Sequence, residues 1–234
     1  MKNLLANRKL VITFFIVIIV LLTLVAFVPL VISLVSGRGV QTEGVNASHA
    51  KAAEVELDGD WTVTKGKPDN HTSVGFTFHE VLPAEKKDTS GSTTAVSGDA
   101  TIENNVLEQG TITVDMNELT TDKKVRDQNM KSKLFETTTY PEATFMVTKP
   151  VDLSAVPDDG TIGKVSLTGD LTIKDQTHEV TEDFDVLRDG KELVVGGDIP
   201  INRTDYDVNT PELIAAKIDE DGFINIRISF KHAN

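Results

Sequence analysis

Two pairs of opposite charges lie close to apolar residues, and these are the side chains best placed to do chemistry. Arg126 and Asp127 are adjacent, and Arg203 precedes Asp205 by two positions, beside Tyr206. Neighbouring helix positions point apart, so the first pair would serve different partners, whereas the second pair would share one face of an extended segment. Two roles fit these residues: ion pairs that fix a loop over one end of the fold, and contact with the polar end of a ligand.

The other reactive residues form no familiar catalytic or metal-binding pattern. The chain has no cysteine, which excludes disulfides, thiolate zinc sites, iron–sulfur clusters and cysteine nucleophiles. His71 and His79 would share one face of a strand but lie about 26 Å apart, too far to bind one metal ion. Nucleotide-binding and serine-hydrolase motifs are missing. We therefore predict no catalytic residue, no metal site and no cofactor, and a protein that is not an enzyme.

Charge is divided sharply along the chain. The only charged residues among the first 37 are Lys2, Arg8 and Lys9. With those three removed from the 23 lysines and arginines, residues 38–234 carry 20 basic and 36 acidic side chains, a net charge of −16. An acidic surface repels phosphate backbones and anionic head groups alike, so we predict no binding to nucleic acid, and non-specific binding to a membrane surface is disfavoured.

Residues 10–35 form an uncharged, largely apolar run that is long enough to cross the hydrocarbon core of a bilayer. Basic residues precede the run and only Arg38 follows closely, so we expect a single-pass transmembrane helix in the cell membrane, with residues 1–9 cytoplasmic and the C-terminal domain extracytoplasmic. A cleaved signal peptide is the alternative, although its apolar region usually spans about 7–15 residues. Residues 36–56 are small, polar and non-periodic, which predicts a flexible linker to a domain over residues 57–234.

Within that domain, apolar and polar residues alternate in one run after another. The period of two is clear at Val74, Phe76 and Phe78 and returns around Ile112 and Phe145. It is typical of strands with one apolar face, and the Gly, Pro, Asn and Asp clusters between the runs mark turns. The pattern predicts an all-β antiparallel meander, either a sandwich or a barrel of about eight strands. Such a barrel is either filled by its own side chains or able to hold one small ligand.

Two segments interrupt the strand pattern. Residues 121–135 lack Gly and Pro and carry apolar residues at Val125, Met130, Leu134 and Phe135, which predicts a short helix. Residues 211–217 are a second helical candidate, because they begin with a proline at a favourable first-turn position. We expect the first helix to lie near one mouth of the barrel as a plug or gate.

Four motifs follow one another in the soluble part: Arg126-Asp127, YPEATF at 140–145, TGDLTI at 168–173 with Thr177 to Val180, and INRTDY at 201–206. In this order they resemble the YceI-like family of lipid- and polyisoprenoid-binding proteins, over roughly residues 57–231. The segment FTFHEVL at 76–82 is similar to a membrane-anchored, actinobacterial-type branch of that family. The resemblance implies an extended, lipocalin-like antiparallel barrel of eight strands with one or two short helices, whose hydrophobic lumen holds an isoprenoid chain.

In such a barrel, the inward-facing apolar residues are the expected lipid contacts. On the strands these are Phe76, Phe78, Ile112, Val114, Phe145, Leu167, Leu171, Ile226 and Ile228, and on the helix they are Val125, Met130 and Leu134. Ordinary core packing is the alternative role of each. The charged residues expected at a polar loop or mouth are Arg126, Asp127, Arg203 and Asp205.

The sequence thus predicts a non-enzymatic carrier that takes the tail of an isoprenoid quinone or polyprenyl lipid into its lumen. The expected partners are that lipid and the membrane, through the N-terminal anchor. The sequence leaves open whether the protein forms a homodimer. The main alternative is a membrane-tethered β domain with a filled core that binds protein or envelope glycan. A third alternative, an enzyme acting on polyprenyl lipid through Asp127, Arg203 and Asp205, lacks a positioned base and nucleophile.

Overall fold

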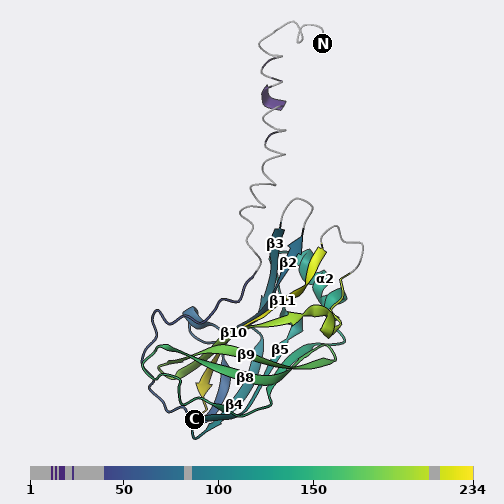
Figure 1. Cartoon of the computed structure of the whole chain (residues 1–234). Helices are drawn as coiled ribbons and strands as arrows, with labels where there is room; N and C mark the ends of the chain where they lie inside the picture. The colour runs from purple at the N-terminus through teal and green to yellow at the C-terminus, as the bar shows by residue number, and fades with distance from the viewer. Residues whose placement is uncertain are drawn as a thin grey trace, which may run out of the picture. The chain divides into compact units, whose positions relative to one another are not determined.

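The computed structural model describes residues 12, 14, 16–18, 23, 40–81, 86–210 and 217–233. The chain separates into two compact units, Met1–Gly37 and Arg38–Asn234, and every strand of the described part belongs to the second (Figure 1). Most of the predicted transmembrane helix over residues 10–35 lies outside the described residues. Among the residues that are described, no helix has both the length and the apolar character needed to span a bilayer.

An antiparallel sheet closes on itself in the second unit. Around the ring the order is β1, β4, β5, β6, β8, β9, β10 and β11, and pairing of β1 with β11 completes the closure. This confirms the predicted all-β barrel of eight strands. The strands are β1 (Gly59–Thr64), β2 (Ser73–Val81), β3 (Lys86–Thr93), β4 (Val96–Glu103), β5 (Val106–Asp115), β6 (Glu142–Val147), β7 (Val151–Asp152), β8 (Ile162–Ile173), β9 (Gln176–Asp189), β10 (Glu192–Asn202) and β11 (Lys217–His232).

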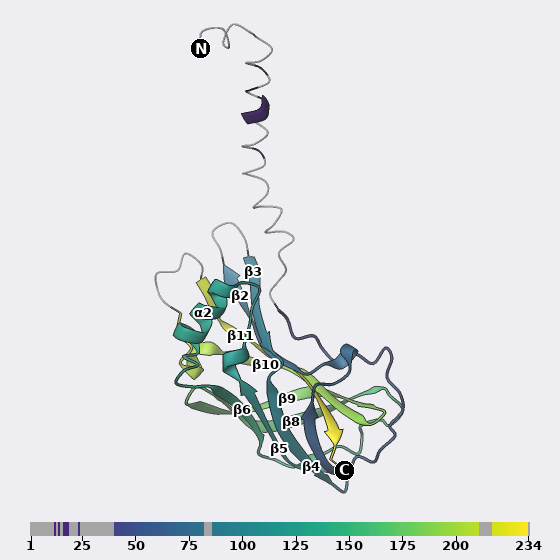
Figure 2. The same ribbon diagram turned by 180° about the vertical axis from the view of Figure 1, so that it is seen from behind.

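The long strand β11 holds both the ring and an extension of it. One edge of β11 pairs with β10, while the other edge pairs through residues 217–227 with β2 and through residues 229–232 with β1. Strand β3 adds to the free edge of β2. The β2–β3 hairpin therefore continues the wall at one end of the barrel, where α2 lies beside it in both views (Figures 1 and 2).

Short helices connect the strands: η1 (Pro68–Asn70), η2 (Met116–Glu118), α2 (Lys124–Asn129), the π-helical η3 (Met130–Leu134) and η4 (Arg203–Tyr206). The helix predicted over residues 121–135 is thus present but starts later, and its second half widens into a π turn. Of the helix predicted over residues 211–217, all but the last residue lie outside the described residues, and Lys217 begins β11 instead.

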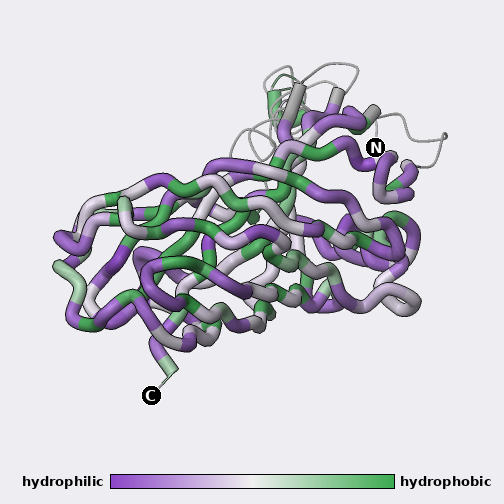
Figure 3. The backbone as a smooth tube through the Cα atoms, turned by 60° about the horizontal axis from the view of Figure 1, so that its bottom comes forward, coloured by the Kyte–Doolittle hydropathy of each residue, from purple (hydrophilic) through white to green (hydrophobic). Residues whose placement is uncertain are grey.

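Hydrophobic and hydrophilic residues alternate along the strands, as the tube in Figure 3 shows. The inward set includes Phe184, Val186, Leu193, Ile199 and Phe230, whose exposed fractions are all 6% or lower. Alternation puts every second side chain of a strand on the same face. The period of two that is visible in the sequence therefore defines the inside of the barrel.

Residues 41–56, here called the strap, run across the outside of the barrel and are hydrogen-bonded to it. The Gly44 carbonyl accepts from Arg227 Nη1 at 3.2 Å, and the Lys51 amide donates to the Asp189 carboxylate at 3.0 Å. The prediction of a flexible linker is therefore wrong for this stretch. Its polar backbone groups find partners on the barrel, and a segment without regular secondary structure has no period that would reveal this docking.

Candidate functional site

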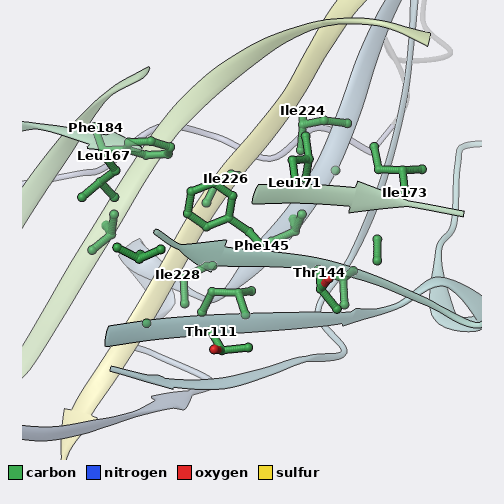
Figure 4. A pocket seen from close by; sticks show the side chains of 18 of the residues that line it. Thr111, Thr144, Phe145, Leu167, Leu171, Ile173, Phe184, Ile224, Ile226 and Ile228 are labelled. Carbon is green, nitrogen blue, oxygen red and sulfur yellow. The ribbon is translucent and has the colours of Figure 1, made fainter. Parts of the chain in front are cut away.

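The inward faces of the strands enclose an apolar cavity. Its empty space, counted together with the opening to solvent, is about 1480 Å³. Figure 4 shows Phe145, Leu171 and Ile226 pointing into this space from three different strands. The apolar lining is Val74, Phe76, Phe78, Ala100, Ile102, Leu107, Ile112, Val114, Met116, Leu119, Phe135, Ala143, Phe145, Val147, Leu153, Val165, Leu167, Leu171, Ile173, Phe184, Val186, Leu193, Val195, Ile201, Val208, Ile224, Ile226, Ile228 and Phe230.

The wall of this cavity presents only apolar atoms to the space inside. Several inward-facing residues, among them Ile112, Phe145 and Ile226, remain partly accessible to solvent. In a closely packed interior such side chains would be sealed by their neighbours. The barrel is therefore hollow along this part of its interior.

A glycine makes room for one of the aromatic side chains in the lumen. Gly169 occupies an inward position of β8, between Leu167 and Leu171, and pairs with Val147 of β6. A Cβ atom at this position would lie 2.5 Å from Cζ of Phe145 and 2.6 Å from the Met146 carbonyl oxygen. The absence of a side chain thus lets the Phe145 ring lie across β8 instead of being pushed away from it.

All nine strand residues predicted as lipid contacts lie in the lining of the cavity: Phe76, Phe78, Ile112, Val114, Phe145, Leu167, Leu171, Ile226 and Ile228. The structure brings them together from β2, β5, β6, β8 and β11. Their contact with a lipid stays a prediction, while their common position is a property of the fold.

The helical residues behave differently. Met130 is buried and Leu134 packs against the core, but neither lines the cavity, and Val125 is 73% exposed. Because a helix turns by about 100° per residue, Val125 points about 140° away from Met130. The expectation that Val125 contacts a lipid inside the lumen is therefore wrong.

Some lining residues were missed from the sequence. Phe135 lines the cavity, and its ring centroid lies 5.8 Å from that of Phe76. Phe184 and Ile224 also line it, and both belong to alternating runs whose period could have identified them. Phe135 follows the π turn, so only the three-dimensional path of that turn shows that it faces inward.

A family model described as the YceI-like domain matches residues 61–230, the part of the chain that forms the barrel and lines the cavity. The chain belongs to the YceI-like domain family. No curated protein matches its sequence.

Two solved structures resemble this YceI-like chain. A polyisoprenoid binding domain from Saccharophagus degradans, described as implicated in plant cell wall breakdown, aligns with a TM-score of 0.58 and 19% identity over 74% of this chain and 98% of its own. BcnA from Burkholderia cenocepacia aligns with a TM-score of 0.54 and 21% identity over 68% of this chain and 94% of its own. At these identities the likeness shows the shared fold.

The two charges on α2 serve different partners in this YceI-like domain, as expected. Arg126 forms an ion pair with Asp122, four residues before it. Asp127 accepts hydrogen bonds from the main-chain amide and the side-chain hydroxyl of Thr121, both at 2.6 Å. Neither Arg126 nor Asp127 lines the cavity, and their bonds fix the start of the helix.

Arg203 is a buried structural residue at the other loop. Its guanidinium donates to the carbonyl of Val208 at 2.7 Å, to that of Asp219 at 3.2 Å and to that of Ile218 at 3.4 Å. These bonds join the end of η4 to the start of β11. The predicted loop-fixing role is present, but the partners in the described part of the chain are these carbonyl groups and the hydroxyl of Thr210, at 3.3 Å, rather than a carboxylate.

The predicted shared face of Arg203 and Asp205 is not formed. Both residues belong to η4, and residues two apart in a 3₁₀ helix point about 120° away from each other. Asp205 is exposed, while Arg203 is buried. The turn forms because the Asn202 side chain accepts from the Thr204 amide at 3.0 Å and caps the segment, a local preference that overrides an extended path.

Tyr206 completes this end of the lining. Burial of its phenol, and secondarily the charge of Asp205, raises the pKa of Tyr206 to about 12. His178 packs edge-on against the Tyr206 ring with 4.9 Å between ring centroids. The hydroxyl therefore stays neutral at physiological pH, and a group with so high a pKa is poorly suited to general acid–base catalysis. Within the described residues, no three His, Asp or Glu side chains gather closely enough to hold a metal ion.

Proposed function

We propose that this YceI-like domain binds the tail of an isoprenoid lipid in its lumen and carries it without catalysing a reaction. The observation that carries this proposal is the cavity wall, which offers a tail only apolar atoms over a length that spans several strands. The polyisoprenoid-binding description of the Saccharophagus degradans neighbour is in keeping with it. We further propose that residues 10–35 tether the domain to the outer face of the cell membrane.

The apolar wall also defines where the two ends of the ligand lie. A polar head group buried without hydrogen bonds would lose roughly 2–7 kcal/mol relative to water. The surface that the wall exposes to the lumen is apolar, although Thr111 and Thr144 are among the lining residues, so the head group would find few partners there. The tail therefore enters the barrel and the head group stays at the opening, so the lumen selects the tail and is indifferent to the head.

The hydrophobic free energy of tail binding favours reversible carriage of the lipid over permanent retention. Each methylene group taken out of water contributes about 0.8 kcal/mol. A lipid that starts in a bilayer has already left water, so most of this gain is cancelled by leaving the membrane. Uptake and release are then close to balance, which lets the lipid move in either direction.

The polar residues near the lumen support binding rather than catalysis. The guanidinium of Arg203 is engaged by carbonyl groups of the loop after η4 and of β11, and Tyr206 keeps its proton. General acid–base catalysis needs a titratable group with a pKa near the working pH, within reach of the substrate. Tyr206 does not meet that requirement, because its pKa is about 12.

The test is uptake of a labelled isoprenoid quinone by the purified full chain, compared between two variants on one strand. Leu167→Arg places a charge in the lumen, whereas Ser166→Arg places the same charge on the exposed face of β8. We expect saturable binding near one quinone per chain, kept by Ser166→Arg and weakened at least about 100-fold by Leu167→Arg, since a buried unpaired charge is very unfavourable. Equal binding by both variants would refute the lumen as the site.

A further inference from the structure

Residues 121–135 carry an unusual charge for this domain. They contain five basic and two acidic residues, although residues 38–234 as a whole have a net charge of −16. The exposed members include Lys123, Lys124 and Lys133, and together with Val125 they form what is here called the basic face.

The charge of the basic face is available for an external partner. The two carboxylates of the segment are already engaged: Asp122 pairs with Arg126, and Asp127 accepts from Thr121. In the described part of the chain, no ion pair involves the lysines of the basic face. Their positive charge is therefore not neutralised within the described structure.

An exposed apolar side chain follows two of these lysines directly along the chain. Val125 is 73% exposed, more than any other large hydrophobic residue described in the barrel unit, where Met146 is next with 50%. Lysines with an apolar side chain between them are suited to the interface of an anionic bilayer, where phosphate groups lie just above the hydrocarbon. The acidic remainder of the domain would repel a nucleic acid and an anionic bilayer alike, so only the basic face could contact either of them.

The inner side of the same segment faces the lumen. Phe135 lines the cavity and contacts Phe76, and Met130 is buried in the core. In Figure 2 the helix α2 lies beside the ends of β2 and β3, at one end of the barrel. One short segment therefore separates the apolar lumen from the basic face.

We propose that the basic face docks on the surface of an anionic lipid bilayer, with the lysines at the head groups and Val125 in the interface. This proposal rests on the proposed function, because docking would bring an end of the lumen against the membrane that supplies the lipid tail. It also gives the domain a preferred orientation, which a tether alone does not provide.

The test uses the full chain and its lack of cysteine, which allows a single labelled position. Val125→Cys carries an environment-sensitive fluorophore, and Met146→Cys, which is also exposed, carries the same probe as the matched control. The labelled chain is reconstituted into vesicles of phosphatidylcholine with or without phosphatidylglycerol, each containing a lipid with a spin-label quencher. Both labelled chains carry the same proposed N-terminal tether. They differ only in the position of the probe on the domain.

We expect the probe at position 125 to be quenched at least about threefold more in phosphatidylglycerol vesicles than in phosphatidylcholine vesicles, and high salt to abolish the difference. The probe at position 146 should show no such difference. Charge reversal by Lys123→Glu, Lys124→Glu and Lys133→Glu should remove the quenching while quinone uptake by the purified chain is kept. Quenching that is equal in both vesicles, absent from both or unchanged by charge reversal would overturn the docking proposal.

The two proposals fail separately. Loss of lipid-dependent quenching with normal quinone uptake would refute the basic face and leave the carrier intact. Charge-dependent quenching in a chain that takes up no quinone would refute the carrier and leave a membrane-docking surface.

Discussion

The two faces of β10 treat apolar side chains in opposite ways. Val194 points outward and is 0% exposed, whereas its neighbour Val195 points inward and stays partly accessible in the lining of the cavity. On β9 both neighbours are buried: Leu187 points outward and is 0% exposed, and Val186 points into the lining of the cavity and is 2% exposed. The barrel is thus tightly covered on its outside at this place and hollow on its inside.

The strap is responsible for the covered side. A Cβ atom on Gly196 would lie 2.7 Å from Cγ2 of Val45, so strap and strand are in close contact. The buried Arg227 guanidinium donates to the carbonyls of Gly44 and His71, which ties the strap and the η1 loop to β11. The two faces differ because residues of the strap pack against the outside of the barrel, whereas no segment of the described chain fills the lumen. Packing given up in the lumen is offset by packing under the strap.

The largest expected effect comes from removing the anchor of the strap. Arg227→Ala leaves the carbonyls of Gly44 and His71 without their donor and opens a void beneath the strap. Because unsatisfied buried groups and lost packing add, the free energy of unfolding should fall by about 3 kcal/mol, measured by urea denaturation. Glu43→Gln is the control and should change it by less than about 0.5 kcal/mol, since Glu43 is exposed. A loss below about 1 kcal/mol for Arg227→Ala would show that the strap is only loosely attached.

Enlarging adjacent residues of β10 separates the two faces directly. Val194→Phe has no space under the covered outer face and should lower the free energy of unfolding by about 1–3 kcal/mol. Val195→Phe has the lumen to occupy and should change it by less than about 0.5 kcal/mol. Thermal or urea unfolding of the two variants measures the difference. Equal destabilisation would mean that the lumen is no more open than the outer face.

A filled lumen should lose its ligand while keeping its fold. Ala143→Phe adds a ring to the wall of the cavity. The quinone tail then has less space, so we expect its affinity to fall about tenfold, equivalent to 1.4 kcal/mol, with little change in melting temperature. Ser166→Phe, on the exposed face of β8, should leave the affinity unchanged. Unaltered binding by Ala143→Phe would place the tail elsewhere.

The smallest effect concerns a carboxyl group on the covered face. Burial, with the nearby charge of Asp189, raises the pKa of Glu192, and its Oε2 atom has no hydrogen-bond partner among the described residues. The folded protein therefore holds this proton more tightly than the unfolded chain, and stability falls as the pH rises through the raised pKa. Glu192→Gln should melt slightly above the wild type near pH 7 and at the same temperature near about pH 4. A variant that is less stable near pH 7 would contradict this assignment.

The sequence was sufficient where a regular period carried the information. Alternation at Phe76, Ile112 and Ile226 predicted both the strands and the side of each strand that faces inward, because a strand has only two faces. It was insufficient for α2 and η4. The π turn after Asn129 and the capped 3₁₀ turn at Arg203 rotate side chains by amounts that simple helical or extended patterns do not reproduce.

The strap marks a second limit of sequence reasoning. Its residues are small and polar, a composition typical of flexible linkers. Its docking depends on partners such as Arg227 and Asp189, which lie more than 130 positions away along the chain. Contacts of this kind follow from the closure of the barrel, and no local sequence pattern predicts them. The hollow lumen could not be predicted from the sequence either, since alternation predicts which residues face inward but not how much space they leave.

The central claim, that the lumen carries an isoprenoid tail, is tested most directly by identifying what the full chain binds in a lipid-containing host. The wild type and its Leu167→Arg variant are purified in parallel, denatured and extracted with organic solvent, and the extracts are compared by mass spectrometry. We predict an isoprenoid lipid near one molecule per chain in the wild type and its absence from the variant. The same lipids in both extracts, or none from folded wild-type protein that also fails to take up added quinone, would contradict the account.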